Sequence, residues 1–237
     1  MTERYARRTI PFVLAAVAAQ VALASPAATA SMSTDCRPFS SGALPLHVVN
    51  QAAASPQTLR SAMLETSAIW VSAGLHLTWT LAPAAVDLAD NPTVFIVIQR
   101  ELDRPPTKRA DPSEGATMPL LGQVPFGEHG PGNLIQVSFE AIASLVMRSS
   151  YLNKPVATFP DFLQQVLVGR ALGRVVAHEI GHWLVGRGHM HEGLMKPALG
   201  DRDLVELNHP RLPRAWTAAG AGVIARPSHC DATTRGD

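Results

Sequence analysis

The sequence has little charge and no clear excess of either sign. Only 16% of its 237 residues are charged, and 20 Lys and Arg residues stand against 19 Asp and Glu residues, a formal net charge of +1. This balance gives no electrostatic case for binding nucleic acid or an anionic surface. Hydrophobic residues make up 46% of the chain, which is typical of a globular protein with a buried core and not of a disordered one.

Cysteine is also scarce. The only two cysteines, Cys36 and Cys230, lie near the two ends of the chain. In an oxidising compartment this arrangement predicts one disulfide that ties the C-terminal tail to the beginning of the domain. A free buried thiol and metal ligation are the alternatives, and neither has a second cysteine nearby to support it.

The N-terminal apolar run, residues 10–24, is too short for a comfortable membrane span. It follows a basic head that contains Arg7-Arg8, and it precedes Ala28-Thr29-Ala30, the small-residue pattern of a signal-peptidase site. We therefore predict a signal peptide over residues 1–30 and a secreted or periplasmic domain over residues 31–237, with no membrane span after signal removal. The Arg pair leaves both the general secretory route and the twin-arginine route open.

No internal repeat and no linker between two cores is visible, so we expect one α+β domain. Ser55-Pro56 is a typical helix start, with a capping hydroxyl followed by proline at the first helical position. Alternating or continuous apolar residues predict strands, and prolines, glycines and charges predict a long surface excursion that includes an edge strand. The predicted strands are 44–50, 75–81, 94–98 and 134–139, the helix is 57–71, the excursion is 103–132 and its edge strand is 120–126.

The longest helical pattern runs from Asp161 to Val185. Its apolar and small residues fall close to one stripe, which we expect to pack on the sheet. Gly173 and Gly181 are poor helix formers, so we expect another part of the backbone to approach closely there. The stripe consists of Phe162, Val166, Gly169, Gly173, Val176, Ile180 and Leu184.

Residues 178–182 of this helix read His-Glu-Ile-Gly-His, the pattern HExxH. A spacing of four residues places His178 and His182 on one face of a helix, one turn apart, where both can bind one Zn²⁺ ion. Glu179 lies beside them and is the expected general base, because it can take a proton from a water that zinc makes acidic. The sequence therefore predicts a zinc site on this helix.

A catalytic zinc ion needs a third protein ligand and one open position. His189 is our first choice, because Gly186 and Gly188 can end the helix and turn the chain back toward the metal. His191 and Glu206 are the alternatives.

The residues His178, Glu179, His182, Gly186 and His189, followed by Met195, resemble the metzincin metallopeptidases. Those enzymes carry HExxHxxGxxH and a methionine turn beneath the metal. The resemblance implies an α+β fold in which a mixed twisted sheet packs on a long active-site helix, and it implies zinc as the cofactor. Here the pattern is HExxHxxxGxxH, one residue longer, and no tyrosine follows it.

We therefore expect an exported zinc metallopeptidase with a protein or peptide substrate. Glu179 would activate water and then pass the proton to the leaving amine, while the substrate pairs with the exposed strand at 120–126. One alternative is a non-catalytic zinc module in which His191 closes the site as a fourth ligand. The other is a zinc amidase that acts on non-protein amides. Cys36 is a further candidate, as a latency ligand to zinc.

Overall fold

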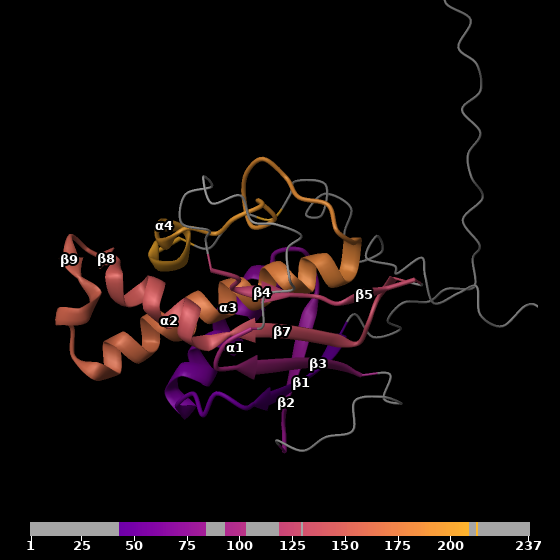
Figure 1. Ribbon diagram of the computed structural model, residues 1–237, viewed down its shortest axis with the longest axis horizontal. Coiled ribbons are helices and arrows are strands. Elements are labelled where there is room, and N and C mark those ends of the chain that lie inside the picture. The colour runs from indigo at the N-terminus through magenta and orange to yellow at the C-terminus, as the bar shows by residue number, and fades with distance from the viewer. Residues whose placement is uncertain (1–42, 84–92, 103–118, 129, 209–211, 213–237) are drawn as a thin grey trace, which may run out of the picture. The chain divides into compact units, whose positions relative to one another are not determined.

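The computed structural model describes residues 43–83, 93–102, 119–128, 130–208 and 212 (Figure 1). The predicted signal peptide, Cys36 and Cys230 lie outside these residues, so the export signal and the disulfide stay predictions. Most of the predicted surface excursion, residues 103–118, lies outside them as well. No helix within the described ranges is both long and apolar enough to cross a membrane.

Five strands form one mixed sheet, in the order β2-β1-β3-β7-β4. The first four of these are parallel to their neighbours, and β4 pairs antiparallel with β7 at the edge. This confirms the predicted fold class, an α+β domain with a mixed sheet packed against helices. The strands span Ala43–Asn50 (β1), His76–Ala82 (β2), Val94–Gln99 (β3), Gly122–Gln123 (β4) and Leu134–Ser138 (β7).

The predicted edge strand at 120–126 is shorter than expected. Only Gly122–Gln123 pairs with the sheet, whereas Phe126 belongs to a small separate hairpin of β5 (Phe126–Gly127) and β6 (Gly130–Pro131). Pro125 lies between the two short strands and has no N–H to donate to a ladder, which is a physical reason for the interruption. A second small hairpin joins β8 (Ser150–Tyr151) and β9 (Lys154–Pro155), and a 3₁₀ turn, η1, follows at Val156–Thr158.

Two of the four helices in the described residues were predicted with their bounds. Helix α1 (Pro56–Val71) begins at Ser55, whose side chain accepts a hydrogen bond from the Thr58 N–H, and α3 spans Asp161–Val185. Helix α2 (Phe139–Arg148) was not predicted, and the strand expected to end at Phe139 ends one residue earlier. Ser138 is the last residue of that strand and also caps the helix, with its hydroxyl accepting from the Ala141 N–H. The short helix α4 (Asp201–Val205) completes the set.

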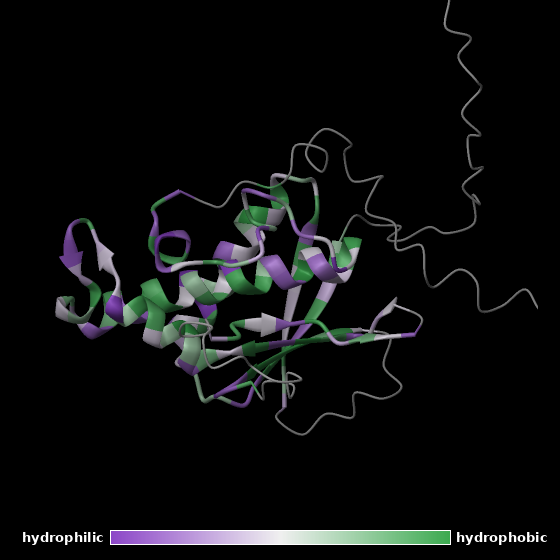
Figure 2. Ribbon diagram, turned by 45° about the horizontal axis from the view of Figure 1, so that its top comes forward, coloured by the Kyte–Doolittle hydropathy of each residue, from purple (hydrophilic) through white to green (hydrophobic). Residues whose placement is uncertain are grey.

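Helices α1, α2 and α3 share one hydrophobic core with one face of the sheet, and the central strands of the sheet are largely hydrophobic in Figure 2. Between Leu167 and Leu184, α3 is buried on nearly every side, rather than along one stripe. The prediction that Phe162 packs in the core is wrong: its exposed fraction is 65%. The first turns of α3 extend past the end of the sheet (Figure 1).

The predicted close approach at Gly173 is confirmed. A Cβ atom added there would lie 2.5 Å from the Ala62 carbonyl oxygen of α1, and one added at Gly169 would lie 2.5 Å from the Thr58 carbonyl oxygen. Two glycines, one turn apart, therefore let the backbones of α1 and α3 touch.

A buried ion pair fixes the segment that follows the site. Arg174, 1% exposed, donates through Nε to Glu65 at 2.7 Å and through its terminal nitrogens to backbone carbonyls of Asp203, Glu206 and Asn208. The Asp203 carbonyl lies within α4, and those of Glu206 and Asn208 follow it. Arg174 therefore ties this part of the chain to α3, one turn before His178.

Candidate metal centre

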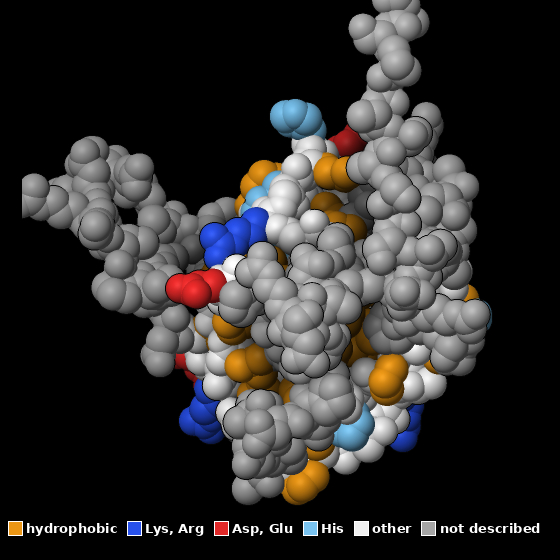
Figure 3. Space-filling model, turned by 90° about the vertical axis from the view of Figure 1, so that its right-hand side faces the viewer, with side chains coloured by type: hydrophobic (Ala, Val, Ile, Leu, Met, Phe, Trp, Pro, Cys, Tyr) orange, Lys and Arg blue, Asp and Glu red, His pale blue; other side chains and the backbone are white. Residues whose placement is uncertain are grey.

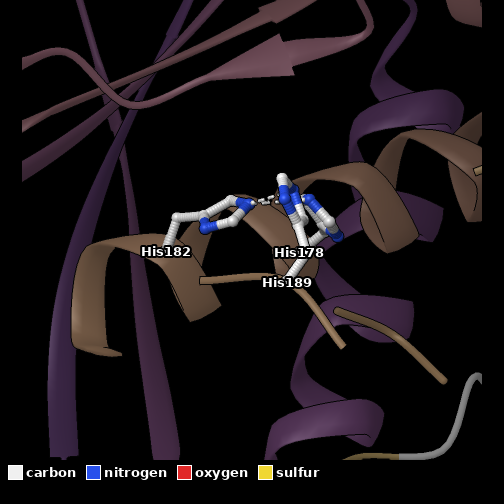
Figure 4. A group of neighbouring side chains, drawn as sticks. All are labelled: His178, His182 and His189. Atoms are coloured by element: carbon white, nitrogen blue, oxygen red, sulfur yellow. Dashed lines mark hydrogen bonds between the residues drawn. The ribbon is translucent and has the colours of Figure 1, made fainter. Parts of the chain in front are cut away.

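His178 and His182 lie one turn apart on the buried middle of α3. Their exposed fractions are 7% and 8%, and their Nε2 atoms are 3.0 Å apart. Figure 4 shows the two rings turned toward each other at the surface of the helix. The four-residue spacing of the motif thus brings two imidazole nitrogens close together on one face of the helix.

The chain turns back immediately after the helix. Gly186 ends α3 with φ 97° and ψ −165°, a conformation that side chains with a Cβ rarely adopt. Of the two glycines expected to make this turn, only Gly186 has a positive φ. The turn places His189 beside the helix, with its Nε2 3.2 Å from that of His182 (Figure 4). The extra residue in the motif therefore does not prevent the third histidine from reaching the other two.

The three side chains form a group with metal-binding geometry. One nitrogen from each of His178, His182 and His189 lies within 4.8 Å of the other two. Nitrogen ligands held about 2.0–2.1 Å from a tetrahedral zinc ion lie about 3.3–3.4 Å from one another. The two observed separations, 3.0 and 3.2 Å, are close to that value. The donor set therefore fits zinc.

The structure does not bring the two alternative ligands to this group. His191 is exposed and is not part of it. Glu206 caps the end of α4, where its Oε1 accepts a hydrogen bond from Arg202 Nε at 2.7 Å. Among the described residues, the group that can hold a metal consists of the three histidines alone.

Backbone carbonyls orient two of the imidazoles. His178 Nδ1 lies 2.6 Å from the Leu194 oxygen, and His182 Nδ1 lies 2.9 Å from the Gly186 oxygen. Because a carbonyl only accepts, each Nδ1 carries the proton and each Nε2 keeps its lone pair toward the centre of the group. Neither contact was predicted from the sequence.

The Leu194 carbonyl belongs to a buried turn that follows the third histidine. Leu194 is 0% exposed and Met195 is 1% exposed, and the Met195 oxygen accepts a hydrogen bond from the Met190 N–H at 2.7 Å. This hydrogen bond closes a turn over residues 190–195, which begins directly after His189. The turn reaches the histidine cluster through the Leu194 backbone.

Burial keeps the imidazoles neutral. Desolvation lowers the pKa of His178 from 6.5 to about 4, with further lowering from His182 and His189, although the Leu194 carbonyl raises it. Burial lowers the pKa of His182 in the same way, against the raising effect of the Gly186 carbonyl. Both groups are therefore free of an Nε2 proton at neutral pH, as ligation requires.

Glu179 is buried between α3 and the edge strand β4. Its exposed fraction is 5%, and desolvation raises the pKa of its carboxyl from 4.5 to about 8. A Cβ atom added at Gly122 would lie 2.8 Å from both Cγ and Oε1 of Glu179. A side chain at this position of β4 would therefore require the Glu179 carboxyl or the strand to move.

These groups line one open cleft of about 620 Å³. The segment 119–124 lines it, as do the three histidines with Glu179, Arg187 of the following loop, and the segment 197–199. Figure 3 shows the side of the molecule toward which the end of α3 points, where the described charged side chains are few and scattered. The cleft offers a carboxyl and three imidazole nitrogens.

No protein-family model and no curated protein matches the sequence. The chain is similar to the crystal structure of archaemetzincin from Methanopyrus kandleri, with a TM-score of 0.49 and 14% identity. The match covers 77% of this chain and 96% of that chain. At this level, the similarity assigns neither a family nor an activity to this chain.

Proposed function

We propose that the protein is a zinc-dependent peptidase of metzincin-like type, which hydrolyses peptide bonds in the cleft beside β4. The observation that carries this proposal is the cluster of His178, His182 and His189, with the carboxyl of Glu179 in the same cleft. A zinc ion held by three imidazoles supplies a Lewis acid that polarises a carbonyl and makes water more acidic.

Glu179 is the proposed general base and acid. It accepts a proton from the attacking water and then delivers that proton to the nitrogen of the leaving amine. Its pKa of about 8 reflects burial alone, and a neighbouring cation would lower that pKa and favour the carboxylate that the first step needs. A carboxyl with a pKa between 4.5 and 8 can both take up and release a proton near neutral pH.

The substrate is proposed to add to β4 as a further strand. On one side β4 pairs with β7, and on its other side no strand of the described residues pairs with it, so a peptide could add there. Gly122 of β4 packs against Glu179, so a peptide paired there passes the catalytic carboxyl. This position favours a main-chain amide as the bond that is cleaved.

A closed, purely structural zinc site is less well supported. That site needs a fourth protein ligand, and His191, the residue expected to supply it, is exposed and outside the histidine group.

Export through residues 1–30 and a disulfide between Cys36 and Cys230 complete the proposal, and both rest on the sequence alone.

The test uses the zinc-loaded protein over residues 31–237 and a library of peptides, with products identified by mass spectrometry. We expect cleavage of internal peptide bonds that a chelator abolishes and added zinc restores. Glu179→Gln should abolish cleavage and leave one zinc ion per chain. Cleavage of cell-wall or other non-protein amides alone would make the protein an amidase. A fully metallated protein that cuts neither class would refute the proposal.

A further inference from the structure

Arg187 lies in the cleft but has no part in the proposed chemistry. It stands between Gly186 and Gly188, in the loop that returns His189 to the helix, and it lines the cleft with the histidines. Its Cζ atom lies 4.8 Å from the centre of the Phe126 ring, a distance typical of a cation–π contact. The guanidinium therefore packs against an aromatic ring in the lining of the cleft.

The charge of Arg187 is not neutralised by the protein in the part of the chain that the structure describes. No carboxylate there lies within ion-pair distance of it. Among the described residues that line the cleft, it is the only Lys or Arg, and most of the others have apolar side chains. A guanidinium that lies over an aromatic ring can still donate its N–H groups to a planar acceptor.

The distance from the reaction centre can be bounded along the chain. Gly122 packs against Glu179, and Phe126, which contacts Arg187, follows four residues later. Four residues of fully extended chain span at most about 14 Å. A peptide that runs along segment 122–126 would therefore bring a residue within about four positions of the scissile bond to Arg187.

We propose that Arg187 is a specificity-determining residue that binds a carboxylate of the substrate within a few residues of the scissile bond. The carboxylate is either an Asp or Glu side chain or the C-terminal carboxylate of a short peptide, since both present the same planar acceptor. This inference rests on the proposed function of the cleft, and Phe126 acts as a positioning residue that holds the guanidinium in place.

Four kinds of otherwise identical peptide distinguish a side-chain carboxylate from a C-terminal one. The reference peptide has a neutral sequence and an amidated C-terminus, and the second differs from it only in a free C-terminus. The third kind is a series of amidated peptides with a single Glu at successive positions around the cleaved bond. The fourth is the matching series with Gln at the same positions. We expect kcat/KM for a carboxylate-bearing peptide to exceed that for its neutral partner by at least about tenfold. The preference should shrink at high salt, because Arg187 is exposed.

Arg187→Gln should lower kcat/KM for the preferred peptide at least about tenfold more than for its neutral partner. Arg187→Lys should keep part of the preference, because the charge remains and the planar fork is lost. The matched control is Arg148→Gln, which replaces an exposed arginine at the end of α2 and should leave the preference unchanged.

Binding measurements separate this inference from the proposed function. In a zinc-loaded Glu179→Gln background, the carboxylate-bearing peptides should bind more tightly than their neutral partners, in the same ranking as their kcat/KM values. Adding Arg187→Gln should remove this difference in affinity. Equal affinities for the carboxylate-bearing and neutral peptides would overturn the role of Arg187 and leave peptidase activity standing. Selective binding without cleavage by the parent protein would support Arg187 and overturn the peptidase.

Discussion

His178 Nδ1 lies 2.6 Å from the backbone oxygen of Leu194, sixteen residues further along the chain. This hydrogen bond joins the buried helix to the turn that follows the third histidine, and it fixes which nitrogen of His178 carries the proton. A backbone carbonyl cannot be removed by a side-chain substitution. The contact therefore orients the imidazole whatever residue stands at position 194, provided that the turn keeps its shape.

The first prediction concerns the metal ligands. Each of the single substitutions His178→Ala, His182→Ala and His189→Ala should lower the affinity for zinc strongly, because each removes one of the three clustered nitrogens. Elemental analysis after dialysis against buffer should find well under one zinc ion per chain in these variants. His191→Ala is the control and should keep a full zinc complement, because His191 lies outside the cluster. Loss of zinc in this control, with full zinc in His189→Ala, would reverse the assignment.

The second prediction concerns the contact between β4 and the catalytic carboxyl. In Gly122→Ala, the new Cβ would lie 2.8 Å from Glu179 Oε1, so either the carboxyl or the edge strand must move. Because general acid–base catalysis contributes about 10²–10⁴-fold, we expect peptide cleavage to fall at least about tenfold with zinc still bound. Gly127→Ala is the control, since its Cβ would lie 3.9 Å from the nearest atom. Unchanged kcat/KM in Gly122→Ala would argue against Glu179 as the base.

The third prediction concerns the packing of α3 on α1. Alanine is a better helix former than glycine by about 1 kcal/mol, which alone would stabilise Gly173→Ala. The added Cβ would, however, lie 2.5 Å from the Ala62 carbonyl oxygen and 2.8 Å from the Glu65 Cβ, so the two helices must separate. We expect a net loss of about 1–3 kcal/mol in the free energy of unfolding, measured by denaturant titration. A stabilised variant would show that propensity outweighs the clash.

Local patterns predicted much of the fold. The strict alternation at 75–81 predicted the strand observed at His76–Ala82, and the bounds predicted for the long helix, Asp161 and Val185, are those observed. Both signals depend on neighbours within a few residues, so they are visible in the sequence. Likewise, HExxH places two imidazoles on one helical face whatever surrounds the helix.

What the sequence did not reveal depends on residues far apart along the chain. Phe139 continues the alternating apolar pattern of Ile135 and Val137 in β7, which hid the change from strand to helix. Ser138 as a cap and Glu140 in the first turn of α2 were available signals. Phe162 falls in the helical period of apolar residues, but it is exposed. Whether a helical side chain is buried depends on which other elements pack against that part of the helix. Every residue carries a carbonyl, so no pattern could single out Leu194 as the partner of His178.

The last prediction concerns the pH dependence of the metal-free protein, and it follows from the burial of Glu179. Its pKa is about 8 in the folded state and 4.5 for the unperturbed group, so between these values the folded protein holds a proton that the unfolded chain releases. This contribution to stability is fully present below about pH 4.5 and is lost as the pH rises through 8. His178 acts in the opposite direction at lower pH, because its folded pKa of about 4 lies below 6.5.

Comparison with Glu179→Gln isolates the carboxyl, since Gln resembles the protonated form and His178 is present in both proteins. With chelator present, wild-type protein should lose about 3–4 kcal/mol of unfolding free energy relative to Glu179→Gln between pH 5 and pH 8. Urea titrations at half-unit pH steps measure this difference. With zinc bound, the difference should shrink, because a cation beside the carboxylate stabilises its charged form in the folded state. Parallel pH profiles for the two metal-free proteins would show that Glu179 is solvated in solution, and the buried general base would then have to be abandoned.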